Sequence, residues 1–342
     1  MKLSIITTVY KAEKDLPRLL DSMMAQKSPE LEFFLIDNGS PDRCGEICRE
    51  YAKKDPRFTV YTLAENIGYI RARNLGIEVC DGDYIGFCDS DDYLEPGGYD
   101  RAVKKIRETD CDLYIAAFYQ DNGAQERLCL PPYAPGVYRA AEELDTIALQ
   151  AFGRMPGRPI LPGFVWKQVY RRSTLMENGI RFALNLMPYE DEVLNVDMIR
   201  HCRCVCCDAN PIYHYVVNEV SITMKLIENF DGKKSWALVE ELYRSKIAMA
   251  VTPEHREAVS NEGLQMIYEY ILVLCKQKLS LTAMTKLFRT DTDRRFILSV
   301  LKGCSEKQPR VLDIVRRCLR SNLVGPLLGA VLLNLKRKYR KT

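Results

Sequence analysis

The chain has 342 residues, of which 47% are apolar and 28% are charged, as in an ordinary soluble globular protein with one large domain or two smaller ones. The net charge of +3 favours no class of partner. No apolar stretch reaches the ~18 residues of a membrane-spanning helix, and no cleavage site follows the short apolar start. We therefore expect a cytoplasmic protein whose thirteen cysteines are reduced thiols.

Two hydrophobic periods alternate through the first 120 residues, because short apolar runs are separated by stretches with helical spacing. The predicted strands are Leu3–Val9, Leu31–Ile36, Phe58–Leu63, Tyr84–Cys88 and Leu113–Tyr119. The predicted helices include Leu16–Met24, Ile47–Tyr51 and Ile70–Val79, and another that Pro96 opens. Strands that alternate with helices predict an α/β fold, with a mostly parallel sheet and helices on both faces.

Polar residues gather where three of these strands end. Thr7-Thr8 closes the first strand, Asp37-Asn38-Gly39 the second and Asp89-Ser90-Asp91-Asp92 the fourth. In an open parallel sheet, ligands bind outside the carboxyl ends of the strands. The coincidence of the three clusters therefore predicts an active site at this edge of the sheet.

The remaining chain changes character twice. Residues 120–165 are rich in proline and glycine, and we expect loops with one helix. The expected elements are a helix near Ala140–Phe152, a helix at Glu190–His201, a strand at Val205–Val217 and only helices after Lys225. We therefore expect a catalytic domain over residues 1–224 and a helical C-terminal region over residues 225–342.

The C-terminal tail is basic, since nine Lys or Arg and one acid, Asp313, follow from Arg310 onward. These charges flank the apolar segment Leu323–Leu335, a pattern that suits an interfacial helix on an anionic membrane. A core helix with a solvated basic end is the alternative, and both interpretations stay open. Peripheral membrane contact through residues 310–342, at the inner face of the plasma membrane, is thus a hypothesis.

The segment Asp89-Ser90-Asp91-Asp92 places three carboxylates within four residues, directly after an apolar strand. Such carboxylates repel one another unless a cation or water screens them. Mg²⁺ or Mn²⁺ would relieve the repulsion and keep positions open for diphosphate oxygens. A solvated turn that caps the next helix is the alternative. The position at a strand's carboxyl end favours the metal site.

Four segments together resemble the family-2 glycosyltransferases, which have the GT-A fold. The segments are Ser4–Tyr10, Leu35–Asp42, Asn66–Ile77, which contains Ala72-Arg73-Asn74, and Gly82–Asp92. Weaker resemblance continues in Trp166–Phe182, Glu190-Asp191, Tyr213-His214-Tyr215 and Ser221-Ile222-Thr223. The departures are Thr8 for a usual Pro, Lys11 for Asn, Asn38 for a second Asp and Val216 for an Arg. The missing Arg leaves one contact to the diphosphate or the acceptor open, which another positive group, such as His214, or no group would then make.

The resemblance implies inverting transfer of a sugar from a nucleotide-sugar donor, with UDP expected, in cell-surface polysaccharide synthesis. The acceptor would be a hydroxyl of a saccharide or lipid-linked saccharide, and no nucleic acid beyond the nucleotide is expected. The resemblance implies Mn²⁺ or Mg²⁺ held by Asp91 and Asp89, and Asp191 as general base with Glu190 beside it. The implied donor-binding residues are Thr8, Tyr10, Asp37, Gly68, Arg71, Arg73, Asp89 and Ser90.

Each of these roles has a structural alternative. Glu190-Asp191 could simply supply favourable charge at a helix N-terminus, Asp37 could form an Asx turn, and Arg73 could pair with a buried carboxylate. A catalytically inactive GT-A protein that binds nucleotide or a partner is the competing function. A nucleotidyltransferase would need a Gly- and Lys-rich loop after the first strand, which this sequence lacks. No dinucleotide-binding glycine motif or P-loop is present.

Overall fold

The structure is a computed structural model that describes residues 1–153, 163–217, 232–276, 291–305 and 308–320. Tertiary contacts divide the chain into two compact units. One unit comprises Met1–Ile147 with Leu161–Lys225, and the other comprises Ala148–Ile160 with Leu226–Thr342. The domain boundary near residue 225 stays a prediction, and the segment 148–160 groups with the C-terminal unit.

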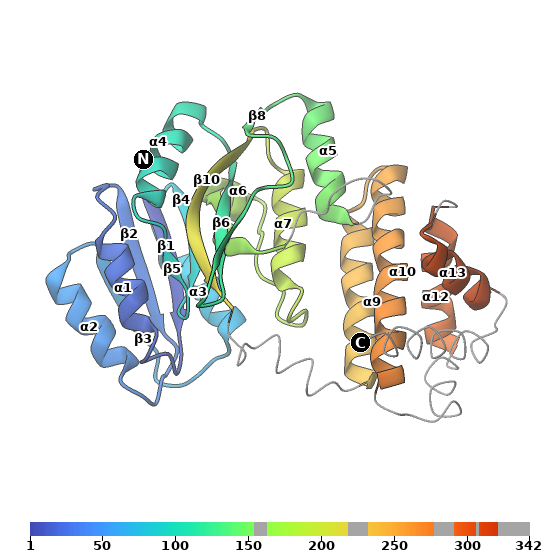
Figure 1. The fold of residues 1–342 in the computed structure, drawn as a ribbon, viewed down its shortest axis with the longest axis horizontal. Helices are drawn as coiled ribbons and strands as arrows, with labels where there is room; N and C mark the ends of the chain where they lie inside the picture. Colours follow the sequence, from blue (N-terminus) through green and yellow to red (C-terminus); the bar gives the residue numbers. More distant parts are fainter. Residues whose placement is uncertain (154–162, 218–231, 277–290, 306–307, 321–342) are drawn as a thin grey trace. The chain divides into compact units, whose positions relative to one another are not determined.

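A mixed sheet forms the first unit, and its ten strands lie within the described residues (Figure 1). The strands are β1 (Leu3–Val9), β2 (Leu31–Asp37), β3 (Phe58–Thr62), β4 (Tyr84–Asp89), β5 (Tyr93–Leu94), β6 (Leu113–Asp121), β7 (Glu126–Cys129), β8 (Gly136–Tyr138), β9 (Gln168–Arg171) and β10 (Val205–Val216). Their order is β3-β2-β1-β4-β9-β6-β10-β5, with β7 on β6 and β8 on β10. Strands β3, β2, β1 and β4 are parallel, as predicted, so their carboxyl ends meet at one edge.

The helices of this unit follow the predicted periodicity closely. They are α1 (Leu16–Met24), α2 (Cys44–Lys54), α3 (Tyr69–Val79), α4 (Gly98–Thr109), α6 (Arg172–Glu177), α7 (Glu190–Arg200) and the short 3-10 helix η1 (Val165–Lys167), and α5 (Ala141–Phe152) extends past the end of the unit's first segment. The predicted α/β class is confirmed.

The prediction that residues 120–165 hold only loops and one helix is wrong, because β7 and β8 lie there. Strand β7 pairs antiparallel with β6, and β8 pairs antiparallel with β10. Both strands are three or four residues long. Strand β9, which is four residues long and lies antiparallel between β4 and β6, was not predicted either. Such short runs carry too little periodicity to be recognised, and pairing with longer strands makes them strands.

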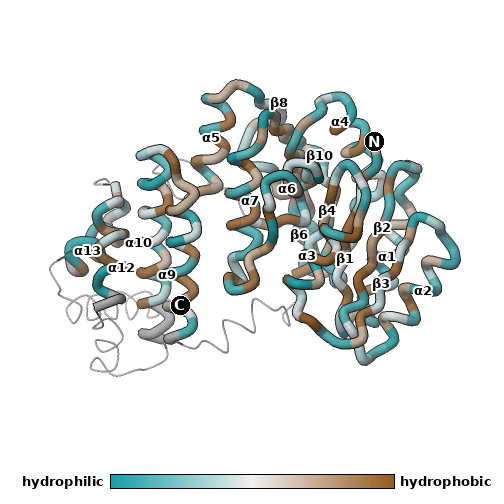
Figure 2. Tube along the Cα trace, turned by 180° about the vertical axis from the view of Figure 1, so that it is seen from behind, coloured by the Kyte–Doolittle hydropathy of each residue, from teal (hydrophilic) through white to brown (hydrophobic). Residues whose placement is uncertain are grey.

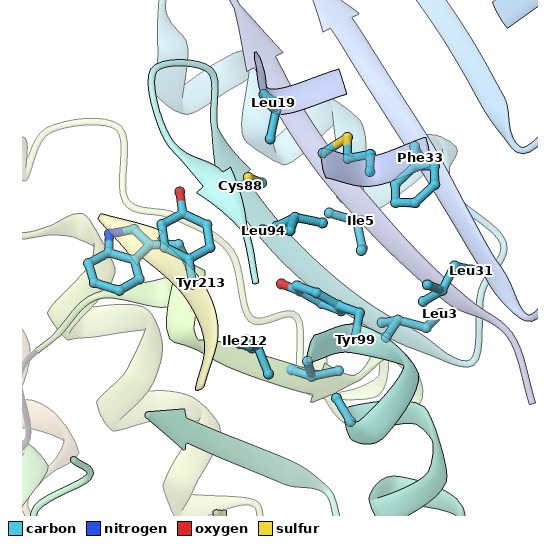
Figure 3. Packing of buried hydrophobic residues seen from close by; sticks show 14 of the residues in the cluster. Leu3, Ile5, Leu19, Leu31, Phe33, Cys88, Leu94, Tyr99, Ile212 and Tyr213 are labelled. Carbon is cyan, nitrogen blue, oxygen red and sulfur yellow. The ribbon is translucent and has the colours of Figure 1, made fainter. Parts of the chain in front are cut away.

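The core of the first unit packs helices against the faces of the sheet. Strands β1 and β2 contribute Leu3, Ile5, Leu31 and Phe33, and these meet Leu19 of α1 (Figure 3). On the other side of β4, Tyr99, Ile212 and Tyr213 extend the same cluster. Hydrophobic residues accordingly run along the central strands in Figure 2. Burial of the strands on both faces makes a rigid platform for the loops at their carboxyl ends.

The second unit is helical in the residues that the structure describes, as predicted. Its helices are α9 (Gly232–Met249), α10 (Pro253–Lys276), α12 (Asp291–Gly303) and α13 (Arg310–Arg320). The rings of Trp236 and Tyr243 each pack against Phe296 with centroids 5.4 Å apart. The buried Lys246 ammonium pairs with Glu262 at 2.6 Å. Across the described ranges, no helix is long and apolar enough to cross a bilayer.

The predicted membrane contact of the tail stays a prediction, because residues 321–342 lie outside the described part of the chain. Within α13, Asp313 forms ion pairs with Arg316 at 2.7 Å and with Arg317 at 2.8 Å. Part of the basic charge of this helix is therefore neutralised locally.

Helix α3 must lie close to β1 to bring its N-terminus to the edge of the sheet, and Gly76 permits this approach. A Cβ added at Gly76 would lie 2.4 Å from Cγ2 of Ile6, a β-branched side chain in a buried strand. We expect Gly76→Ala to lower the free energy of unfolding by ~1–3 kcal/mol despite alanine's better helix propensity. Urea unfolding would measure this, with Glu78→Ala on the exposed face of α3 as the control. Equal stability of the two variants would contradict the prediction.

Candidate active site

A cavity of about 670 Å³ opens at the carboxyl ends of β1, β2 and β4. Its lining joins residues that are far apart in sequence. The predicted site residues found in this lining are Thr8, Tyr10, Gly68, Arg71, Arg73, Asp89, Ser90, Asp91, Glu190 and Asp191. Asp37 is the predicted residue that lies outside it. The fold thus collects the chemically distinctive side chains of the first unit in one hollow.

Asp37 is buried beneath the cavity and is 3% exposed. Its Oδ1 accepts a hydrogen bond from the Ser40 N–H at 3.1 Å, which is an Asx turn. Its Oδ2 lies against Gly45 of α2, where an added Cβ would come within 2.4 Å. Asp37 therefore forms the Asx turn that was the alternative to a binding role, and its contact with a donor stays a prediction.

Asn38, which departs from the family pattern, ties the end of β2 to the loop before α3. Its Oδ1 accepts a hydrogen bond from the Ile67 N–H at 3.0 Å, and its Nδ2 donates to Asn66 Oδ1 at 3.2 Å. Asn66 Oδ1 also accepts from the Gly68 N–H at 2.8 Å. A carboxylate at position 38 could not donate the second of these bonds. The departure is thus explained by local hydrogen bonding.

The N-terminus of α3 faces the cavity. Gly68 precedes the helix with φ +87°, and residues 68–71 all line the hollow. The first N–H groups of a helix have no partner within the helix and carry partial positive charge, so they favour anions. Arg71 is exposed in this first turn and adds a full positive charge. This side of the cavity therefore suits a diphosphate.

Arg73 lies at the centre of the site and is 4% exposed. Its Nη2 donates to Asp89 Oδ1 at 2.5 Å, and its Nη1 donates to Asp191 Oδ1 at 2.9 Å. The guanidinium also lies over the Tyr69 ring, 4.6 Å from its centroid. The structure therefore shows Arg73 paired with buried carboxylates, which was the alternative to a contact with phosphate. Its guanidinium joins two carboxylates that are 102 positions apart in sequence.

The three aspartates after β4 have different surroundings. Asp92 is 1% exposed and accepts hydrogen bonds from the Tyr213 hydroxyl and the Val216 N–H, each at 2.7 Å. Burial, together with the charges of Asp89 and Asp91, holds the pKa of Asp92 well above its usual range. Asp92 is therefore a structural residue that joins this loop to β10.

Asp91 instead faces the cavity with a carboxylate that no other described residue bonds. Burial, and next the negative charge of Asp89, raises the pKa of Asp91. A divalent cation between Asp91 and Asp89 would remove both effects, so the donor set fits Mn²⁺ or Mg²⁺. In the described ranges no group of three His, Cys, Asp or Glu side chains could hold a metal. A cation here would need substrate or water oxygens to complete its coordination.

Glu190 and Asp191 open α7 beside these groups. Burial raises the pKa of Asp191 to about 6, although the Arg73 guanidinium counteracts the shift. Burial also raises the pKa of Glu190 to about 8, and the Asp191 charge adds to this. Glu190 is 2% exposed, and its Oε2 has no hydrogen-bond partner in the described structure. Both carboxyl groups can therefore exchange protons near neutral pH, which a solvated helix cap would not do.

Sequence reasoning missed the apolar wall of the cavity. Its members are Phe164, Trp166, Leu184, Met187, Pro188 and Tyr215. The spacing of Tyr213 and Tyr215 in a strand could have shown that both share one face. Phe164 gave no signal, because it follows a stretch rich in Pro and Gly.

His214 points to the opposite face of β10 and does not replace the missing Arg. Its Nε2 lies 2.6 Å from Glu95 Oε2, and its ring stacks between Tyr93 and Tyr119 with centroids 4.3 and 4.9 Å away. Because His214 does not line the cavity, the suggestion that it makes the diphosphate or acceptor contact of the missing Arg is wrong.

Fold and site together define an α/β protein in which a cavity at the strand ends brings a helix N-terminus close to paired carboxylates. Residues 4–134 match the family model for glycosyl transferase family 2. The chain is 29% identical over 220 residues to the uncharacterized glycosyltransferase EpsJ of Bacillus subtilis, covering 64% of this chain and 62% of that protein. It is 26% identical over 240 residues to the poly(ribitol-phosphate) beta-glucosyltransferase of Bacillus spizizenii, and the match covers 68% of this chain and 35% of that protein. The chain thus spans less than two thirds of either relative.

Solved structures share this fold. The chain resembles TarS of S. aureus, residues 1–349, in complex with UDP, with a TM-score of 0.69, 17% identity, and coverage of 99% of this chain and 92% of that one. A TarS complex with UDP-GlcNAc matches with a TM-score of 0.64 and 18% identity. The match over residues 4–134 supports the predicted resemblance to family-2 glycosyltransferases, and the N-terminal unit has the GT-A fold that the sequence predicts.

The raised pKa of Glu190 makes stability depend on pH. Between the ordinary carboxyl pKa and about 8, the native state keeps a proton that the unfolded state releases, so stability falls as pH rises. Glu190→Gln removes this effect. We expect the variant to gain about 1.4 kcal/mol per pH unit relative to wild type between pH 5.5 and 7.5. Urea unfolding at several pH values would measure the trend, with Glu192→Gln in the same helical turn as the control. A pH-independent difference would contradict the prediction.

Proposed function

We propose that the protein transfers a sugar, with inversion, from a nucleotide-sugar donor to an acceptor hydroxyl in cell-surface polysaccharide synthesis. The observation that supports this best is the cavity itself, where the N-terminus of α3, the pair Asp89 and Asp91, and the buried Asp191 meet. UDP is the nucleotide we propose, because similar folds are named in complex with UDP and UDP-GlcNAc. The Bacillus spizizenii relative is named as a beta-glucosyltransferase, which supports sugar transfer as the reaction.

The donor would lie across the ends of β1 and β2. Thr8 and Tyr10 line this part of the cavity, together with Asn38. The diphosphate would lie at the N-terminus of α3, where backbone N–H groups and Arg71 offer positive charge. This orientation directs the anomeric carbon of the donor sugar toward β4 and Asp191.

The departing nucleoside diphosphate gains negative charge as the glycosidic bond breaks. Asp91 and Asp89 would hold Mn²⁺ or Mg²⁺, which supplies Lewis-acid stabilisation of that charge. The Arg73 guanidinium holds Asp89 by a hydrogen bond to Oδ1, one of the two oxygens of the Asp89 carboxylate. The other oxygen of Asp89 and the carboxylate of Asp91 then stay available on the cavity side.

The acceptor hydroxyl must lose a proton as it attacks the anomeric carbon. Asp191 is the base we propose, because a buried carboxylate with a pKa of about 6 accepts a proton readily and is still ionised at neutral pH. Arg73 donates to Asp191 Oδ1, and the Val165 N–H lies 3.4 Å from Oδ2. These contacts orient the carboxylate toward one face of the donor, as a single inverting displacement requires.

Asp91→Ala tests the proposal at its centre. We expect release of nucleoside diphosphate from one donor of a nucleotide-sugar panel to need Mn²⁺ or Mg²⁺ and to fall roughly 100-fold or more in this variant. EDTA should give the same loss in wild type. The control is Asp81→Ala, since Asp81 is an exposed carboxylate that precedes β4, whereas Asp91 follows it. If UDP failed to bind wild type with Mn²⁺ present, the proposed function would be overturned.

Asp191→Asn should lower kcat for sugar transfer roughly 10²–10⁴-fold and leave UDP affinity unchanged. Wild type should lose activity on acidification, tenfold per pH unit, below an apparent pKa not above about 6, because the base must be ionised. The variant should lack this acidic limb. Steady-state kinetics from pH 4.5 to 8 would show it, and an unchanged limb in the variant would assign the titration to another group.

A further inference from the structure

Four aromatic rings beside Asp191 lie nearly parallel to one another. Trp166 is at their centre, with centroid distances of 5.1 Å to Phe164, 4.7 Å to Tyr213 and 5.4 Å to Tyr215. The planes differ by 15°, 14° and 2° in these three pairs. We call Phe164, Trp166 and Tyr215, which line the cavity, the aromatic wall.

The inner rings are buried and the outer ones are not. Tyr213 is 0% exposed and Trp166 is 3% exposed, whereas Phe164 is 44% exposed and Tyr215 is half-buried. Leu184, which also lines the cavity, is 54% exposed. Large apolar side chains that stay exposed around a cavity mark a surface that a ligand covers.

The wall is attached on two sides to the groups that we propose for catalysis. The N–H of Val165, between two wall residues, points to Asp191 Oδ2 at 3.4 Å. Tyr213 donates to Asp92 Oδ2, and the Asp89 N–H donates to the Tyr213 hydroxyl at 3.0 Å. A ligand on the wall would therefore lie beside the proposed base Asp191, and the bonds of Tyr213 to Asp89 and Asp92 would fix the position of the wall.

The order of strands separates this wall from the nucleotide side. Strands β2 and β1 lie on one side of β4, whereas β9, which η1 directly precedes, and β10 lie on the other. The nucleotide residues Thr8, Tyr10 and Asn38 come from the first side, and the wall comes from the second. The wall thus has the position of an acceptor site.

The charge of the cavity narrows the class of acceptor. Within the described lining, the cations are Arg71 and Arg73. Arg71 lies in the first turn of α3, on the nucleotide side, and Arg73 is paired with two carboxylates. Lys167 behind the wall is 2% exposed and lies 5.9 Å from the Phe164 centroid. Within this described lining, a phosphate on the wall would therefore find no exposed cation, whereas a neutral sugar ring needs none.

A pyranose ring has a face of C–H groups that carry slight positive charge, and an aromatic ring has a negative face. The two surfaces stack, and the hydroxyls at the sugar's edge remain free to bond. We propose that the aromatic wall binds the sugar ring of the acceptor, stacked on Phe164 and Tyr215, with one hydroxyl at Asp191. The acceptor is then a neutral pyranoside and not an acyclic polyol phosphate. This inference rests on the proposed function.

Ligand-observed saturation-transfer NMR on the full chain, with UDP and the diamagnetic ion Mg²⁺, tests the inference without turnover. The probes are methyl pyranosides of glucose, galactose and N-acetylglucosamine, set against ribitol 5-phosphate and glycerol 1-phosphate. We expect transfer to the C–H protons of at least one pyranoside and none to the polyol phosphates. Phe164→Ala should reduce this signal roughly fivefold. Phe164→Trp should keep it, because the stacking face is restored.

Leu128→Ala is the matched control, since Leu128 is also 44% exposed but lies on β7, outside the cavity lining. The inference is overturned if no pyranoside binds, if the polyol phosphates bind equally well, or if Phe164→Ala behaves like the control. UDP titration by calorimetry on the same samples shows that each variant is folded and separates the two proposals. UDP binding without pyranoside binding overturns only the acceptor site, and pyranoside binding without UDP binding overturns the proposed function.

Titration with the UDP-sugar that wild type hydrolyses addresses the donor sugar. We expect Phe164→Ala to leave the affinity for this donor unchanged relative to UDP. If the variant instead loses affinity for the UDP-sugar and keeps its affinity for UDP and for the pyranosides, the ring belongs to the donor sugar and the inference is wrong.

Discussion

The site depends on the double ion pair of Arg73. One guanidinium, buried in α3, holds Asp89 at the end of β4 and Asp191 at the start of α7. Without it, two carboxylates would face each other in a poorly solvated space, and one would be protonated. Breaking such a buried network typically costs about 3–5 kcal/mol. The same contact therefore stabilises the fold and sets the separation of the two proposed catalytic groups.

Around this ion pair, the cavity holds more negative charge than the protein neutralises. Asp92 is satisfied by hydrogen bonds from Tyr213 and Val216, whereas the carboxylate of Asp91 accepts no bond from another described residue. Glu190 is buried with a pKa of about 8, so it keeps its proton at neutral pH. The unneutralised carboxylate of Asp91 suits a site that binds a cation, and the raised pKa values of Asp191 and Glu190 suit a site that exchanges protons.

The two halves of the cavity differ in their physical chemistry. The half near β1 and β2 has backbone N–H groups, asparagines and Arg71, which suit a charged and hydrogen-bonding nucleotide. The half near η1 and β10 has parallel aromatic rings and no exposed cation within the described lining. Between them lie the carboxylates. This arrangement is consistent with the proposed transfer, in which a charged donor and a neutral acceptor must meet at one carbon.

The sequence alone determined the central strands and helices, because long apolar runs and helical spacing encode them locally. It also determined that Thr8, Asp89 and Asp91 would gather, since parallel strands share one carboxyl edge. Only the tertiary structure decided that Arg73 bonds carboxylates, that Asp37 closes a turn and that His214 faces away. The bond from Arg73 to Asp191 and the contact of His214 with Glu95 join segments more than a hundred residues apart, whereas the turn at Asp37 is local and was one of two alternatives that the sequence left open. The strands β7, β8 and β9 and the aromatic wall belong to the same group, because long-range packing and not local pattern creates them.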